Sequence, residues 1–262
     1  LLIDQNNFIY QIRNNRSDAS TTQGNRISIE KFDETLQSQW IKTITPEDYS
    51  NILEDSHEYS SAIGVDNSIY IVGKTNDFSV SNGGPTQNLE NNDGFVIKIN
   101  QTDGEQIWSS SFVTDYQDVV TDITTTDDDN IYITGFTDGD LENNINRFED
   151  ASQAIRDTFI SKINSNDGTK EWSKLLEYAE EEYPVSIDTD SSGSIFVLGF
   201  TADDEINNDY SLVARNRGID KVFLSKFEPN EGSEIWTKSI DLGPFSMMPS
   251  KLLIDENDDL YI

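Results

Sequence analysis

The chain has 262 residues, of which 35% are hydrophobic and 10% aromatic, and this is enough apolar material for a packed core. Asp and Glu number 49 against 18 Lys and Arg, and the resulting net charge of −31 disfavours binding to nucleic acid and to anionic membrane surfaces. There is no cysteine, which excludes disulfides and cysteine-bound zinc, and no apolar stretch approaches the length of a membrane-spanning helix.

The predicted elements form repeated units of four strands each. The first strand of a unit is short and apolar and ends in aspartate, as at 1–4, 63–66, 185–188 and 252–255. An Asp/Asn-rich turn leads to the second strand, a long polar loop to the third, and a hairpin to the fourth. In the last three units the hairpin contains Asp-Gly or Glu-Gly, which suits the positive φ angles of a tight turn.

The second strand is predicted from the apolar runs 69–73, 131–135 and 195–199. These runs are apolar on both faces, which is typical of a strand buried between two layers. Each run ends in a glycine that we expect to serve the structural packing of the units: Gly73, Gly135 and Gly199.

The third strand is predicted at 27–32, 95–99, 159–163 and 223–227, and a tryptophan follows each one across the hairpin. The tryptophans are spaced by 68, 64 and 64 residues, which indicates a repeat. Their regular position favours packing in the core between units over stacking on a ligand. The four residues are Trp40, Trp108, Trp172 and Trp236.

Four strands per repeat, with inner strands buried on both faces, predict an all-β fold in which each unit is an antiparallel blade of a β-propeller. We expect one domain over 1–262, with blades at about 1–46, 57–115, 116–180 and 181–243 and the start of a fifth at about 244–262. Because the fifth unit contains only its first two strands, we expect an excerpt of a longer polypeptide and a closed ring of about six to eight blades.

The repeat resembles the SBBP-type β-propeller repeat of bacterial secreted and surface proteins. The resemblance rests on the aspartate-turn-apolar-Gly-x-Thr block at 188–201, on the Asp-x-Phe-x-x-Lys blocks at 93–98 and 157–162, and on the hairpin with its tryptophan. It covers nearly the whole chain, although the first unit lacks the Asp-Gly pair and the fourth has an extra residue between Asp220 and Phe223. It implies a propeller placed outside the cytoplasm, commonly in a large multidomain protein, and no fixed reaction. A weaker similarity to quinoprotein-like blades implies the same role for tryptophan, without the quinone.

The acidic turns after the first strands are candidate Ca²⁺ sites. At 188–193, carboxylates alternate and are followed by Ser and Gly, which can direct several oxygens at one cation. The closing glutamate of an EF-hand loop is missing, because Gly199 holds its position. A plain turn is the alternative that we favour, since Asp, Asn and Gly tolerate turn geometry. The candidate metal ligands are Asp127, Asp129, Asp188, Asp190 and Ser192, and no other cofactor is predicted.

No catalytic residue is predicted. His57 is the single histidine, so neither a Ser-His-Asp triad nor a zinc site is expected. The three glutamates at 180–182 are interpreted as solvated surface and not as paired catalytic carboxylates. The loops at 76–92, 138–156 and 202–219 are rich in Asn and Asp with scattered aromatic residues, which would suit the binding of a glycan or a protein.

These observations favour a non-catalytic structural or interaction module of a large secreted or cell-surface bacterial protein, acting in adhesion, matrix building or a surface layer. The expected partners are a protein or glycan at the cell surface and further blades from the same polypeptide or a partner copy. The alternatives are a propeller enzyme, either a quinoprotein-like dehydrogenase or a carbohydrate-active hydrolase, and a Ca²⁺-dependent glycan-binding module.

Overall fold

The computed structural model describes residues 1–15, 26–44, 59–76, 92–114, 117–139, 141, 156–176, 181–202, 219–240 and 249–262. Every regular element in these ranges is a β-strand, as the sequence predicts. Within the same ranges there is no helix that is long and apolar enough to cross a bilayer.

The described strands form four four-stranded sheets and one two-stranded sheet, in chain order. The first sheet contains β1 (Leu2–Ile3), β2 (Ile9–Asn15), β3 (Arg26–Phe32) and β4 (Ser38–Ile44). The second contains β5 (Ser60–Ile63), β6 (Ile69–Asn76), β7 (Asn92–Ile99) and β8 (Gln106–Phe112). The third contains β9 (Asp118–Thr125), β10 (Ile131–Thr137), β11 (Asp157–Ile163) and β12 (Lys170–Leu176). The fourth contains β13 (Glu181–Thr189), β14 (Ile195–Ala202), β15 (Ile219–Phe227) and β16 (Glu234–Ile240), and β17 (Leu253–Ile254) and β18 (Leu260–Tyr261) form the fifth.

Each four-stranded sheet is an antiparallel meander, because its strands pair in chain order. This confirms the predicted sequence of turn, loop and hairpin within a unit. The second strands of the second, third and fourth sheets are enclosed on both faces, and every residue of β10 is buried. A strand that is apolar on both faces can be buried in this way only if other layers cover both sides of its sheet.

The turn between the first and second strands has the same backbone in all five described units. The fourth residue of the turn donates its N–H to the carbonyl of the first, as Asp129 does to Thr126 at 3.0 Å. The fourth residue also has a positive φ of 61° to 79°, a conformation that Gly, Asn and Asp adopt most easily. The residues at this position are Asn7, Asn67, Asp129, Gly193 and Asp258.

The hydrophobic cores lie between sheets. In one of them, Tyr70 and Val96 of the second sheet pack with Ile133 and Phe159 of the third. Equivalent cores join the first sheet to the second, the third to the fourth, and the fourth to the segment that contains Leu252. Because each core takes side chains from two units, the burial of apolar surface couples every unit to its neighbours.

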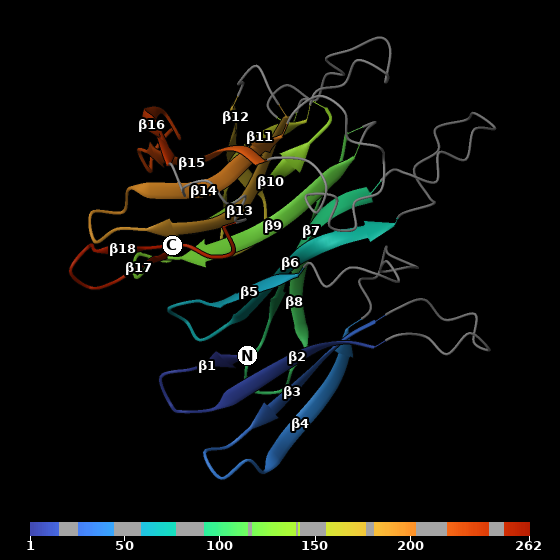
Figure 1. Cartoon of the computed structure of the whole chain (residues 1–262). Helices are drawn as coiled ribbons and strands as arrows, with labels where there is room; N and C mark the ends of the chain where they lie inside the picture. Colours follow the sequence, from blue (N-terminus) through green and yellow to red (C-terminus); the bar gives the residue numbers. More distant parts are fainter. Residues whose placement is uncertain are drawn as a thin grey trace, which may run out of the picture.

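The first strands of successive sheets also lie next to one another, from β1 through β5, β9 and β13 to β17. Figure 1 shows the sheets stacked in chain order, with their tight turns at one end. Four-stranded antiparallel sheets stacked face to face, with adjoining first strands, have the arrangement of propeller blades. The chain therefore has a propeller-like all-β fold, and we refer to its four-stranded sheets as blades.

Candidate functional site

Each blade carries three side chains in cross-strand register, namely an aromatic residue on the second strand, a lysine on the third and a tryptophan on the fourth. In the second blade, the ring centroids of Tyr70 and Trp108 are 6.0 Å apart, with Lys98 on the strand between them. The corresponding centroid distances in the other blades are 6.2, 6.1 and 5.9 Å. We name these triplets the docking rows: Tyr10-Lys31-Trp40, Tyr70-Lys98-Trp108, Tyr132-Lys162-Trp172 and Phe196-Lys226-Trp236.

The first three docking rows contact the hairpin turn of the following blade. Lys98 Nζ and Trp108 Nε1 donate to the same main-chain oxygen, that of Ser165, at 2.9 and 3.0 Å. The equivalent contacts are Lys31 Nζ to Gln101 O at 3.0 Å and Tyr132 Oη to Pro229 O at 3.4 Å. The acceptor is the second residue of the turn in every case, so the interface repeats even where the donor changes.

The glycine of the same turn provides the surface on which the indole ring rests. Gly168 has a φ of 75°, and a Cβ at this residue would lie only 2.6 Å from the ring of Trp108. A Cβ on Gly104 or Gly232 would meet the preceding tryptophan in the same way, at 2.9 Å from Trp40 and 2.6 Å from Trp172. These three tryptophans thus lie between blades, and Trp236 packs in the last described core.

The glycines of the second strands pack within their own blade. A Cβ on Gly135 would lie 1.9 Å from the carbonyl oxygen of Val119 on β9 and 2.7 Å from the ring of Phe159 on β11. The pairing of β9 with β10 shifts register at this point, which brings the first strand close to the glycine. Gly199 has the same surroundings, formed by Tyr183 and Phe223, and Gly73 is buried opposite Phe95.

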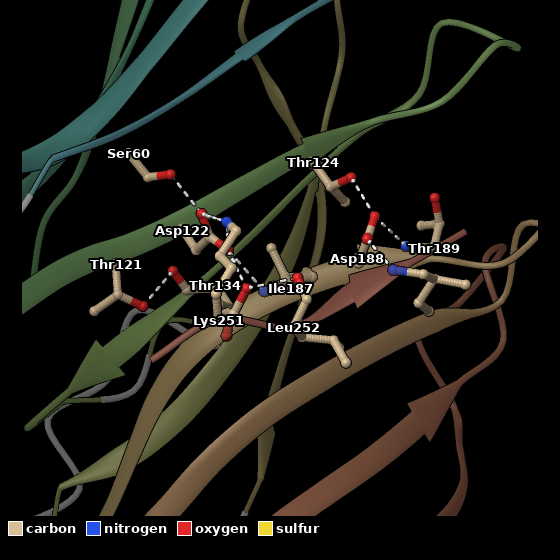
Figure 2. A network of polar contacts seen from close by, with 12 residues as sticks. Ser60, Thr121, Asp122, Thr124, Thr134, Ile187, Asp188, Thr189, Lys251 and Leu252 are labelled. Carbon is tan, nitrogen blue, oxygen red and sulfur yellow. Dashed lines mark hydrogen bonds and ion pairs between the residues drawn. The ribbon is translucent and has the colours of Figure 1, made fainter. Parts of the chain in front are cut away.

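A network of polar side chains joins the first strands of several units (Figure 2). Its centre is Asp122 of β9, which is 2% exposed. Asp122 Oδ2 accepts the hydroxyl of Ser186 at 2.7 Å and the N–H of Ile187 at 2.9 Å, both from the next blade. Asp122 Oδ1 accepts the hydroxyl of Ser60 from the preceding blade. Lys251 Nζ, from the fifth unit, lies 3.0 and 2.9 Å from the two oxygens, so one carboxylate holds donors from three other units.

Asp188 of β13 makes similar contacts one blade further along the chain (Figure 2). Its Oδ2 accepts the N–H of Ile254 at 2.8 Å, and its Oδ1 accepts the hydroxyl of Thr124 at 3.3 Å. The sequence pattern predicts Asp188 at the end of the first strand and the start of the acidic turn, but it lies inside β13, two residues before the turn begins at Asp190. We name these residues the inner-strand network: Ser60, Asp122, Thr124, Ser186, Asp188 and Lys251.

The other candidate metal ligands lie at turns, where Asp190 and Asp129 accept hydrogen bonds from the chain itself. Asp190 Oδ1 accepts the hydroxyl of Ser192 at 2.6 Å, and Asp190 Oδ2 pairs with Lys226 Nζ at 2.9 Å. Burial raises the pKa of Asp190, but these contacts outweigh it and hold the pKa below its ordinary value. Asp129 Oδ2 accepts the hydroxyl of Ser165 at 2.5 Å, and Asp127 is exposed. In the described part of the chain, no three acidic or histidine side chains are grouped to hold a metal, and the Ca²⁺ assignment stays a prediction.

A group of buried charges lies at the opposite end of the third and fourth blades. Arg156 donates from Nε to Asp138 at 3.0 Å, from Nη2 to Gln117 at 3.1 Å and from Nη1 to the hydroxyl of Tyr183 at 2.8 Å. Its guanidinium carbon lies 4.5 Å from the ring centroid of Phe136. These contacts join the ends of several strands from two blades, which rigidifies the base from which the loop at 138–156 departs.

Asp118 follows Gln117 and begins β9 as a fully buried carboxyl. The hydroxyl of Thr137 and the N–H of Thr114 each donate to it at 2.5 Å. Burial, together with the nearby charge of Asp93, raises the pKa of Asp118 to about 7 against the lowering effect of those hydrogen bonds. Asp118 therefore changes charge near neutral pH inside the protein.

One interpretation of the acidic residues was wrong, and others fall outside the described residues. Glu182, expected on the solvated surface, is 0% exposed, because it holds the register position in β13 that Asp118 holds in β9. His57, Glu180 and most of the loops at 76–92, 138–156 and 202–219 lie outside the described residues.

Asp118, Asp122, Arg156 and Lys251 are charged residues of these groups that were not singled out from the sequence. The available signal was a charge within an otherwise apolar strand, as at Asp122 among Val119, Val120 and Ile123. Such a residue cannot be buried without partners, so its position alone would have indicated a polar contact between units.

No family model matches the chain, and no curated protein matches it. Among solved structures, it is similar to a protein of unknown function from Dyadobacter fermentans DSM 18053, with a TM-score of 0.59 and 9% identity over 98% of this chain and 71% of that one. The Dos1 propeller has a TM-score of 0.40 and 7% identity, over 89% of this chain and 47% of its own. A protein of unknown function from Bacteroides caccae has a TM-score of 0.28 and 10% identity, over 88% of this chain and 83% of its own. At such low identity, the likeness to the Dyadobacter protein shows a shared fold alone.

Proposed function

We propose that the chain is a non-catalytic structural or interaction module, built as a β-propeller, within a large secreted or cell-surface bacterial protein. The resemblance of its repeat to the SBBP type supports the placement outside the cytoplasm. The high negative charge supports it as well, because a strongly charged surface favours solubility in a salty medium.

The observation that carries the proposal is the use of the recurring polar groups. In the described residues, the lysine and tryptophan of the second docking row are directed at the next blade, where both bind the carbonyl of Ser165. Catalysis or ligand binding by a propeller requires polar groups directed away from the blade contacts. Side chains used in this way build a rigid scaffold, which is the property needed by a structural module.

The partners that we propose are further blades of the same kind and a protein or glycan of the cell surface. A further blade is supported by the fourth docking row, Phe196-Lys226-Trp236, because the same triplet receives a hairpin turn in the other three blades. A surface ligand is supported by the composition of the long loops, where aromatic side chains stand among Asn and Asp.

Asp118 is the feature that a hydrolase interpretation would use, because a carboxyl with a pKa of about 7 has the proton affinity of a general acid. Its burial supports the non-catalytic proposal instead. The carboxyl is 0% exposed and accepts hydrogen bonds from Thr137 and Thr114 of its own chain, so a substrate would reach it only after these contacts open.

The proposal is tested on the full-length protein in the cells that produce it. We expect antibody labelling of intact cells, and loss of surface adhesion or of an ordered surface layer when residues 1–262 are deleted. A second variant, Phe78→Ser/Phe148→Ser/Tyr210→Ser, replaces one aromatic residue in each of the three long loops, and we expect weaker capture of surface glycans or proteins. Turnover of oligosaccharides or quinone-dependent oxidation that requires residues 1–262 would overturn the proposal.

A further inference from the structure

Asp122 accepts hydrogen bonds from three units other than its own. Its donors come from the second blade through Ser60, from the fourth through Ser186 and Ile187, and from the fifth unit through Lys251. The carboxylate itself belongs to the third blade. Four consecutive units are therefore held by the two oxygens of one side chain (Figure 2).

The contact between Lys251 and Asp122 joins two units that are not consecutive. Lys251 precedes β17, which neighbours β13 of the fourth blade, yet its ammonium group binds Asp122 of the third blade at 2.9 and 3.0 Å. Repeat proteins whose units contact only their neighbours transmit stability from one interface to the next. A contact between units that are not consecutive adds a direct connection to that chain of interfaces.

The two side chains of the ion pair differ in exposure, so removing the exposed lysine acts mainly on the buried aspartate. The side chain of Lys251 is 59% exposed, whereas that of Asp122 is 3% exposed. Removing the lysine costs little apolar packing but leaves a buried carboxylate without its cation, which is strongly unfavourable. The charge of Asp122 is then stabilised only by its remaining hydrogen-bond donors, and Ser60 of the second blade is one of them.

We propose that Asp122 couples the stability of the second blade to that of the fifth unit, so that the inner-strand network stabilises four units cooperatively. Asp188 contributes to the same coupling, because it accepts hydrogen bonds from Thr124 of the third blade and from Ile254 of the fifth unit. The network would keep the first strands of the blades together when a fourth strand or a loop is displaced by a partner.

The test is hydrogen–deuterium exchange of the full-length protein carrying Lys251→Met. We expect the amides of β17 to exchange faster, and those of β5 as well, by at least about threefold, since opening of a locally bonded unit follows its free energy. Lys251→Arg retains the ion pair and should leave β5 unchanged. Lys42→Met is the matched control, because Lys42 forms an exposed ion pair with Glu105 of the neighbouring blade and should affect no strand of the network.

A double substitution separates coupling from simple proximity. If Asp122 connects the two units, the loss of protection in Ser60→Ala/Lys251→Met will be smaller than the product of the two single effects, because both act on one carboxylate. Faster exchange confined to residues 249–262, or a double variant whose effect equals the product, would overturn the proposal.

Discussion

The docking rows and the inner-strand network join the same blades by opposite means. Each docking row uses one pattern of three residue types, and the partner of the first three rows is the hairpin turn of the following blade. In the inner-strand network, one register position holds serine, aspartate and serine in three successive blades, at Ser60, Asp122 and Ser186, and Lys251 of the fifth unit binds the aspartate. Repetition therefore builds the interfaces, whereas the departure from repetition fixes which unit lies beside which.

The largest expected effect breaks a docking row. Trp108→Ala removes a buried indole that rests on Gly168 and donates to Ser165, and it should lower the free energy of unfolding by about 3–5 kcal/mol. Urea unfolding followed by circular dichroism measures the change. Ile107→Ala removes the exposed neighbouring side chain and should have little effect; an equal loss in both variants would contradict the docking role.

The next prediction concerns Asp118, which lies on β9 together with Asp122 of the inner-strand network. Its pKa of about 7 in the folded state exceeds its ordinary value of 3.8, so between these pH values the folded protein holds a proton that the unfolded chain releases. Its contribution to stability is present at low pH and is lost as the pH rises to about 7, with a slope of up to about 1.4 kcal/mol per pH unit.

Asp118→Asn should flatten that slope, as measured by urea unfolding between pH 4 and 8. Asp127→Asn, at an exposed turn, removes one carboxylate from the surface and should keep the slope of the native protein. If the two variants show the same pH dependence, the titrating group lies elsewhere.

The contact of glycine with tryptophan can be separated from the strain of a positive φ. Gly168 and Gly193 have φ angles of 75° and 79°, but only Gly168 faces an indole ring, and a Cβ at Gly193 would have nothing within 4 Å. Gly193→Ala should cost about 1 kcal/mol of stability and Gly168→Ala at least about 2 kcal/mol. Equal losses in thermal unfolding would show that strain alone matters at both turns.

A smaller effect distinguishes two docking rows from each other. Trp108 Nε1 donates to Ser165 O, whereas Trp172 Nε1 is buried without a hydrogen-bond partner. Trp108→Phe should therefore destabilise the protein by about 1 kcal/mol more than Trp172→Phe. The reverse order in paired urea titrations would contradict the assignment of the hydrogen bond.

The smallest expected effect concerns calcium. If the acidic turns are plain turns, as the contacts of Asp190 with Ser192 and Lys226 favour, removal of Ca²⁺ with a chelator leaves the melting temperature unchanged. A reproducible fall that added Ca²⁺ reverses would support the metal assignment, because a ligand that binds the folded state raises its melting temperature.

The repeated part of the structure could be predicted from the sequence because each residue type recurs at a fixed spacing. Tryptophan, the turn glycine and the apolar second strand each return about every 64 residues, and the strands lie where these landmarks place them. The first strand predicted at 63–66 is an exception, because β5 is Ser60–Ile63 and residues 64–67 form the turn. The glycine of the second strand was recognised too, although its close contact with Val119 within the blade depends on a register shift that leaves no periodic signal.

The inner-strand network could not be predicted in the same way. Asp122 corresponds to serine in the blades on either side, so no recurring pattern marks it. Its burial depends on Lys251, which is 129 positions away in the sequence. Glu182 was misread for a related reason, because acidic residues are usually solvated and only the register with Thr201 shows that this one is enclosed.

The contact between each hairpin turn and the docking row before it has a consequence for how such a chain could grow during evolution. Because each blade presents a hairpin turn on one side and a docking row on the other, duplication of a whole repeat would supply matching surfaces at both new junctions. Duplication of the first two strands alone would supply neither the hairpin turn nor the lysine and tryptophan of a docking row. A copy inserted beside the third blade would still separate Asp122 from Ser60 or Ser186, so new repeats are expected to be tolerated best away from that blade.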